Sequence, residues 1–223
     1  MGVSITITSG DGFELDAYLA LPEGEPKAAI LVIQEIFGVN AHIREVADGY
    51  AADGYAALAP ALFDRVEKGV ELGYEGDDLA RGAGIAFNEL DMANTLADLA
   101  ACANHLTIYG KVGSVGYCYG GLMSFLSSCN IDVLACSVGY YGGGIANNLD
   151  QKPKIPLMLH FGELDAHIPM EDVEKIKAVN TDVPVHTYNA DHGFNCDHRA
   201  SYNAQAAKIA RERTIEFFEQ HLA

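Results

Sequence analysis

The segment GYCYG, residues 116–120, places a cysteine between two glycines at the point where an apolar run gives way to a helical pattern. This G-x-C-x-G spacing is that of a nucleophile elbow, with Cys118 in place of serine. Glycine fits two residues before and after the nucleophile because so tight a turn brings those positions close to neighbouring backbone. The turn would raise the thiol above a sheet, at a helix N-terminus whose dipole favours a thiolate. The spacing therefore predicts a nucleophile, and a buried cysteine in a glycine-rich turn is the alternative.

A thiol nucleophile needs a base, and the base needs a group that orients it. For this elbow the expected chain order is nucleophile, acid and histidine. Asp165 follows the apolar segment IPLMLHFG, and His192 follows VPVHTYN in a loop before the last helical pattern. We therefore predict that Cys118, Asp165 and His192 form a triad. Glu163 could replace Asp165, although it lies nearer the strand, and Asp191 is disfavoured because chain neighbours rarely face each other.

The loop QEIFGVN, directly after the apolar segment AAILVI, is a second source of groups for this chemistry. An oxyanion hole needs two backbone N–H groups, one from the residue after the nucleophile and one from such a loop. The positions that meet this requirement are Tyr119 and Ile36. Glu35 would then be an acid beside the thiol, and a solvated loop carboxylate is the alternative for it.

The elements that must position these residues alternate along the chain, which implies a mostly parallel sheet with helices on both faces. The segments predicted as strands are 4–8, 13–21, 28–33, 55–62, 111–117, 133–142, 155–162 and 183–189. The segments predicted as helices are 42–54, 84–106, 119–129, 170–179 and 202–222. The first two strands, joined by SGDG, indicate an antiparallel hairpin. Residues 64–84 are acidic and glycine-rich and are predicted to be a loop.

The composition predicts one globular domain, residues 1–223, because 49% of the residues are apolar and no linker or repeat divides the chain. The net charge is −17, with 31 acidic residues against 14 basic ones, which argues against nucleic acid and membrane surfaces as partners. The apolar stretches are too short to span a bilayer, and no secretory signal is visible. Five cysteines without a CxxC pair indicate a reduced, cytoplasmic protein.

Histidines in the C-terminal part of the chain raise the possibility of a metal site. Their spacings of 19, 6 and 6 residues match no compact zinc motif, so we expect neither a metal nor an organic cofactor. These histidines are His167, His186, His192 and His198. The cysteines predicted to fill the core or its margin are Cys102, Cys129 and Cys136.

Five segments resemble, in this order, dienelactone hydrolase (carboxymethylenebutenolidase), a family with the α/β-hydrolase fold: QEIFGVN, GYCYGG, VGYYG, GELDAHIP and DHGF. The match covers essentially the whole chain, and QEIFGVN and the cysteine elbow are its specific parts. The resemblance implies an α/β-hydrolase fold, a monomer, and a small-molecule ester or lactone as the partner. It implies hydrolysis of a cyclic enol-lactone, dienelactone, to maleylacetate in bacterial breakdown of catechols, through a thioester intermediate.

The resemblance carries Cys118, Asp165 and His192 over as the catalytic triad. It carries Glu35 over as the carboxylate that helps to generate the thiolate when substrate arrives. The residues that it places in the substrate pocket are Arg81, Tyr141, Phe37 and Arg199. Arg81 is matched to an arginine that holds the substrate carboxylate, and Tyr141 to a pocket tyrosine.

Two positions depart from the family pattern. The family has a second arginine four residues after the catalytic histidine, where this chain has Cys196, and Arg199 could compensate from three residues further on. A pocket tyrosine expected four residues after Arg81 is Ile85. These departures favour a broad-specificity small-ester carboxylesterase as the alternative function. A non-catalytic ligand-binding or redox-sensing protein is the alternative from another class, and the complete triad order argues against it.

Overall fold

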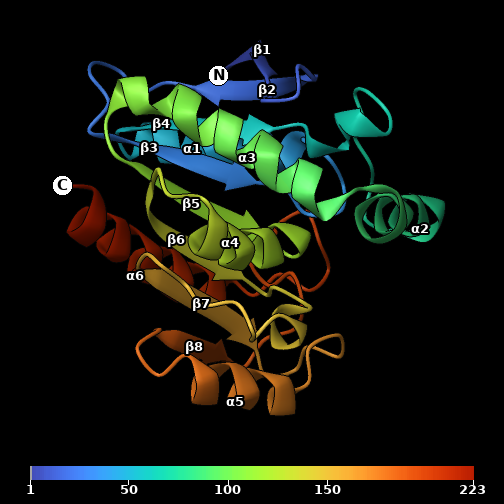
Figure 1. Cartoon of the computed structure of the whole chain (residues 1–223). Coiled ribbons are helices and arrows are strands. Elements are labelled where there is room, and N and C mark those ends of the chain that lie inside the picture. Colours follow the sequence, from blue (N-terminus) through green and yellow to red (C-terminus); the bar gives the residue numbers. More distant parts are fainter. Residues whose placement is uncertain (1) are drawn as a thin grey trace.

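The computed structural model describes residues 2–223, and Met1 lies outside them. Eight strands form one sheet in the order β1-β2-β4-β3-β5-β6-β7-β8 (Figure 1). The pairs β1–β2 and β2–β4 are antiparallel, and the pairs that join β4 to β8 are parallel, as the alternation of elements predicts. The strands are β1 (Val3–Thr8), β2 (Glu14–Ala20), β3 (Ala28–Ile33), β4 (Tyr55–Pro60), β5 (Val112–Tyr117), β6 (Leu134–Tyr140), β7 (Leu157–Gly162) and β8 (Val185–Tyr188).

Helices cover both faces of this sheet (Figure 1). The α-helices are α1 (Ala41–Ala52), α2 (Gly76–Gly84), α3 (Met92–Leu106), α4 (Tyr119–Asn130), α5 (Met170–Val179) and α6 (Ala204–Leu222). Short 3-10 helices lie at Leu62–Arg65, Thr107–Tyr109 and Ile145–Asn147. α3 and α4 pack side by side on one face and α1 and α6 lie on the other, while α2 lies beyond the end to which the arrows of β3 and β5 point. Within the described residues, no helix combines the length and apolar character needed to cross a membrane.

The central strands are apolar or small at nearly every position because helices cover both faces of the sheet. Every residue of β3, β4 and β5 is buried. This packing fixes the strand ends, and the loops that leave them can therefore hold functional groups in place.

The junction between β5 and α4 is a tight turn with Cys118 at its apex. Cys118 has φ of 56° and ψ of −113°, a conformation that costs a non-glycine residue of the order of 1–3 kcal/mol. A Cβ on Gly116 would lie 1.9 Å from the carbonyl oxygen of Gly120, and a Cβ on Gly120 would lie 2.3 Å from that of Ile33. The glycines therefore let α4 approach β3 and β5, which is the reason predicted from the spacing.

Gly120→Ala is expected to destabilise the protein by at least about 2 kcal/mol, because the new methyl group would overlap the backbone at the end of β3. For a chain of this length such a change lowers Tm by roughly 4–8 °C. Gly10→Ala is the matched control, since a Cβ there meets no atom within 4 Å. Thermal unfolding followed by circular dichroism measures both variants, and equal Tm values would contradict this account of the elbow.

Two predicted segments are wrong in detail. Residues 64–84, predicted as a loop, contain α2. Residues 84–106, predicted as one helix, divide into a π-helix at Ile85–Glu89 and α3. The division falls at Leu90, whose backbone is extended, and Asp91 caps α3 by accepting a hydrogen bond from a backbone N–H of the first turn at 2.9 Å. A helix cap thus overrides the continuous apolar pattern.

Candidate active site

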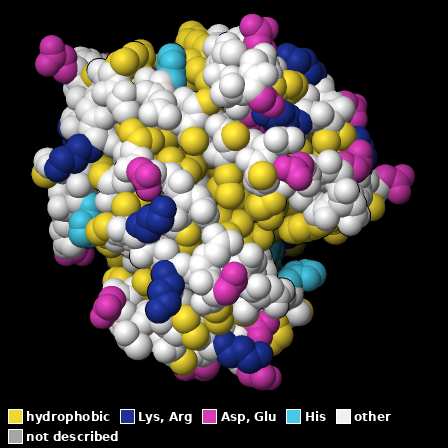
Figure 2. All heavy atoms as spheres, in the orientation of Figure 1, with side chains coloured by type: hydrophobic (Ala, Val, Ile, Leu, Met, Phe, Trp, Pro, Cys, Tyr) yellow, Lys and Arg dark blue, Asp and Glu magenta, His cyan; other side chains and the backbone are white. Residues whose placement is uncertain are grey.

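Cys118 opens onto a cavity of about 650 Å³ beyond the C-terminal ends of the parallel strands. The lining comes from the loops after β3, β6, β7 and β8, from α2, and from the start of α4. Apolar side chains gather near the middle of the face seen in Figure 2, and acidic side chains are scattered around them. This is the end of the sheet at which ligands bind in folds of this kind.

The imidazole of His192 interacts with both of the other predicted triad residues. Its Nδ1 lies 2.7 Å from Asp165 Oδ2, and the ring lines the same cavity as Cys118, which interacts with it electrostatically. Asp165 is held in turn, because its Oδ1 accepts hydrogen bonds from the backbone N–H groups of His167 and Ile168 at 2.8 and 3.2 Å. Burial lowers the pKa of His192, but the negative charge of the Cys118 thiolate and the hydrogen bond to Asp165 outweigh burial and raise that pKa to about 10. The protonated imidazole thus places a positive charge in the same cavity as the Cys118 sulfur.

The two rival acids lie differently. Glu163 is exposed, and its Oε1 accepts a hydrogen bond from the Thr187 hydroxyl at 2.8 Å. Asp191 accepts a hydrogen bond from the backbone N–H of His192 at 2.6 Å, so it binds the main chain and not the ring. Asp165 is therefore the acid that faces the imidazole.

Glu35 is fully buried, and its charged partner is Arg199. Nη1 of Arg199 lies 3.3 Å from Glu35 Oε1, and the guanidinium is 5.7 Å from the ring centroids of Phe37 and Tyr74. A turn closed by a 3.1 Å hydrogen bond from the Arg199 N–H to the Cys196 carbonyl carries the chain to this position. Arg199 thus places a positive charge beside Glu35, although the resemblance expects that arginine three residues earlier.

Ile36, Phe37 and Tyr119 line the same cavity as Cys118. Tyr119 is the first residue of α4, so its N–H lies among the free donors of a helix N-terminus. Gly82 of α2 packs on the loop after β3, since a Cβ there would lie 2.0 Å from the Ile36 carbonyl oxygen. These positions agree with the predicted oxyanion hole, whose role stays a prediction.

Tyr141 is fully buried, and its ring centroid lies 5.0 Å from that of His192. Its φ of 37° places it in the left-handed region, which non-glycine residues seldom adopt. Burial raises its pKa well above 10, so the hydroxyl keeps its proton, and that hydroxyl has no hydrogen-bond partner among residues 2–223. Tyr141 therefore packs against the base and does not line the cavity.

Arg81 is the predicted site residue that the structure leaves apart from the others. It is absent from the cavity lining, and its guanidinium pairs with Glu67 at 3.1 Å and with Glu89. Ile85, at the position of the expected tyrosine, is buried and likewise outside the lining. Arg199 is the arginine that reaches the cavity.

Sequence reasoning missed the wall that α2 and the π-helix contribute. Leu79, Ala83 and Phe87 line the cavity and are spaced four residues apart, so they share one side of the helical segment. That spacing was a usable signal, but acids and glycines around it favoured a loop. Asn147 and Asn148, in the loop after β6, add polar groups that no motif marks.

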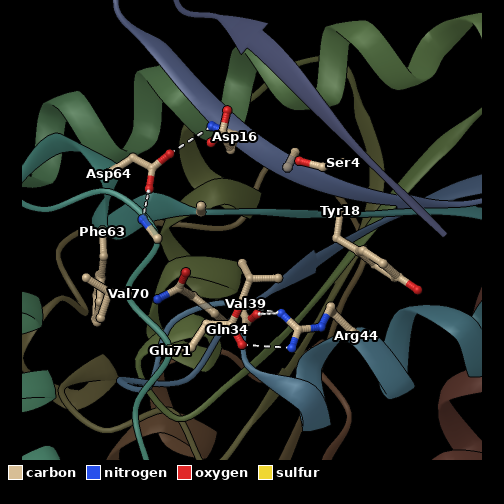
Figure 3. A pocket seen from close by; sticks show the side chains of 13 residues that line it. Ser4, Asp16, Tyr18, Gln34, Val39, Arg44, Phe63, Asp64, Val70 and Glu71 are labelled. Atoms are coloured by element: carbon tan, nitrogen blue, oxygen red, sulfur yellow. Dashed lines mark hydrogen bonds and ion pairs between the residues drawn. The ribbon is translucent and has the colours of Figure 1, made fainter. Parts of the chain in front are cut away.

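A second cavity of about 360 Å³ lies between β2 and the segment 61–71 (Figure 3). Both Nη atoms of Arg44 bind the Glu71 carboxylate at 2.7 Å, and Asp64 accepts hydrogen bonds from the backbone N–H groups of Asp16 and Gly69 (Figure 3). Neither cysteine nor histidine is among the described residues that line it. The predicted thiol chemistry therefore has its candidate site in the cavity at Cys118.

The sheet order, the strained elbow after β5, and the acid and histidine after β7 and β8 define the α/β-hydrolase fold. Residues 15–222 match the model of the dienelactone hydrolase family, and the chain belongs to this family.

Relatives agree over nearly the whole length. The chain is 34% identical to a carboxymethylenebutenolidase of Pseudomonas putida, over 96% of this chain and 94% of that protein. It is also 34% identical to a provisionally named carboxymethylenebutenolidase of Synechocystis sp., over 94% of this chain and 93% of that protein. The crystal structure of a provisionally named dienelactone hydrolase from Klebsiella pneumoniae subsp. pneumoniae superposes with a TM-score of 0.84 at 28% identity and covers 99% of both chains. The chain is therefore a hydrolase of carboxylic ester bonds.

Proposed function

We propose that this protein hydrolyses a small, activated, anionic ester or lactone through a thioester on Cys118, with dienelactone as the favoured substrate. The observation that carries the proposal is that Cys118 and His192 line one cavity and that Asp165 is hydrogen-bonded to the His192 ring. Both the P. putida and the Synechocystis relatives take their names from the lactone carboxymethylenebutenolide.

The reaction begins when the Cys118 thiolate attacks the carbonyl carbon and a C–S bond forms. The oxyanion accepts hydrogen bonds from the N–H groups of Ile36 and Tyr119, and one such donor lowers the barrier by roughly 3 kcal/mol. As the C–O bond breaks, His192 gives its proton to the leaving oxygen. A water molecule then loses a proton to His192, attacks the thioester and releases the acid, which returns Cys118 to the thiolate.

Glu35 and Arg199 connect the substrate with the nucleophile. In the absence of substrate the guanidinium of Arg199 pairs with Glu35. A substrate carboxylate would compete for that guanidinium and leave the Glu35 carboxylate free to accept the proton of the Cys118 thiol, which generates the thiolate. An enol lactone suits a thiolate nucleophile because the enolate is a good leaving group. With a poor leaving group, the tetrahedral intermediate would instead lose the thiolate and return to the ester.

The alternative hydrolase is a broad-specificity carboxylesterase for small neutral esters. The mostly apolar lining supports this alternative, because few groups besides Arg199 favour an anion there. A ligand-binding or redox-sensing protein without turnover is the alternative from another class. The strained backbone of Cys118 weighs against it, because such strain is kept where a reactive group must be aimed.

Arg199→Ala is expected to lower kcat/KM for dienelactone by roughly 10–100-fold, the loss of a charge-assisted hydrogen bond. Because Arg199 also neutralises Glu35, p-nitrophenyl acetate loses some rate as well, and the ratio between the two substrates is the quantity to measure. Arg44→Ala is the matched control, since Arg44 also pairs with a glutamate but lies at the second cavity. A larger selective loss in Arg81→Ala, or the same loss on both substrates in Arg199→Ala, would assign the anion site elsewhere.

A further inference from the structure

Three side chains of types that commonly bind metal ions meet next to the candidate active site. Glu35, His42 and Cys196 each offer one ligand atom, and the three atoms lie within 4.8 Å of one another. All three residues are buried, with relative exposures of 0%, 3% and 0%. None of the three lines the cavity at Cys118, so this group is separate from that cavity.

This group contains polar atoms whose burial is not compensated. Glu35 Oε2 and both ring nitrogens of His42 are buried and have no hydrogen-bond partner among the described residues. Nδ1 of His42 lies 3.3 Å from Asp197 Oδ1, but the two atoms are not aligned for a hydrogen bond. An unsatisfied buried polar atom is destabilising, and in native proteins it points to a bound ion or water.

We propose that Glu35, His42 and Cys196 form a binding site for a divalent transition-metal ion of the Zn²⁺ class. Thiolate and imidazole are ligands that Zn²⁺ and its neighbours prefer, whereas Mg²⁺ and Ca²⁺ are held by oxygen ligands. Three protein ligands and one water complete the four-coordinate geometry of Zn²⁺. On binding, the Cys196 thiol releases its proton to solvent and a sulfur–metal bond forms.

A second group of ligands supplies the route inward. His42, Glu45, Asp197 and His198 also offer ligand atoms within 4.8 Å of one another, and Glu45, Asp197 and His198 are exposed. This outer group shares His42 with the buried one. A surface cavity of about 340 Å³ is lined by His42, Glu45 and Asp197. An ion can therefore be captured at the surface by His198, Glu45 and Asp197 and then pass through His42 to the thiolate.

Glu35 couples this site to the hydrolase. Its Oε1 faces Arg199, whereas Oε2 is the oxygen left without a partner. A metal ion bound to Oε2 would compete electrostatically with Arg199 for the same carboxylate. The consequence, slower hydrolysis when the metal is bound, rests on the proposed function, but metal binding itself does not.

The test is titration of metal-stripped wild-type protein with Co²⁺, an optical probe for thiolate ligation, and with Zn²⁺ in equilibrium dialysis. We expect one ion per chain, a sulfur-to-cobalt charge-transfer band, and a rise in Tm with Zn²⁺. Cys196→Ser and His42→Gln should each weaken binding at least tenfold, and Cys196→Ser should remove the band. Thermal unfolding checks that both variants are folded. Because His42 lies in α1 and Cys196 in the loop before α6, a loss of binding in both is not explained by damage to one element.

Two further variants locate the ion. Cys118→Ala and His198→Gln should keep the band and the stoichiometry, because neither residue belongs to the buried group. The proposal is overturned if wild type binds no stoichiometric ion, or if the band survives Cys196→Ser. It is equally overturned if Cys118→Ala abolishes the band, which would put the metal at the nucleophile. Because these readouts do not use turnover, they remain valid if the protein proves not to hydrolyse dienelactone.

Discussion

Replacing Cys118 by alanine is expected to reduce kcat/KM for p-nitrophenyl acetate by at least about 10³-fold, because the atom that forms the thioester is removed. The fold should persist, since the contacts that hold the elbow are made by the backbone of this residue. Its N–H donates to the Tyr140 carbonyl at 3.0 Å, and its own carbonyl accepts from Gly121 and Leu122 at 2.9 and 3.2 Å. Alanine keeps these bonds, so Tm should change by only a few degrees.

Cys129→Ala is the matched control for this variant. Cys129 lies at the other end of the same helix and is a buried free cysteine, and burial raises the pKa of its thiol. We expect a loss of stability of about 1 kcal/mol from the lost packing and activity within twofold of wild type. A Cys118→Ala variant that is folded and keeps wild-type turnover would contradict the nucleophile assignment.

Asp165→Asn is expected to lower kcat by roughly 10²–10⁴-fold with little change in KM. The backbone N–H groups of His167 and Ile168 would still find an oxygen, so the side chain should stay in place. The amide NH₂ would replace the oxygen that now accepts from His192 Nδ1, and this reverses the direction of that hydrogen bond. The imidazole would then present the wrong tautomer to Cys118.

The same substitution changes how His192 holds its proton. The Asp165 carboxylate is one of the groups that raise the pKa of His192 to about 10, so its removal should lower that pKa. We therefore expect the alkaline limb of the kcat/KM profile to move to lower pH in the variant. Glu163→Gln is the control, because Glu163 binds Thr187 at the surface, and it should change kcat less than twofold. If Glu163→Gln were the damaging variant, Glu163 would be the orienting acid.

That Cys118, Asp165 and His192 meet could be predicted from the sequence because each lies in the turn or loop that follows a strand of the sheet, β5, β7 and β8. A parallel sheet brings the C-terminal ends of its strands to one edge, so residues distant in the chain meet there. The glycines around Cys118 were equally readable, since a short turn between β5 and α4 leaves no room for a Cβ. The periodicity of strands and the residue preferences of tight turns are local properties, so they can be read from one sequence.

The wall of the cavity could not be predicted in this way. Gly82 belongs to the glycine-rich segment 64–84 that is predicted as a loop, yet it lies within α2, where a side chain would strike the Ile36 carbonyl. Arg199 reaches Glu35 through the irregular turn that begins at Cys196, and no periodicity describes such a turn. The position of His42 beside Cys196 depends on how α1 meets the loop before α6, which is a matter of tertiary packing.

Mass spectrometry of the protein quenched in acid during turnover of p-nitrophenyl acetate tests the central claim most directly. The account predicts one acetyl group per chain, on the peptide that contains Cys118, which disappears once substrate is exhausted. The same experiment with Cys118→Ala should give no acetylated peptide. Turnover without acetylation of Cys118, or with a stable acetyl group on another residue, would contradict the thioester mechanism.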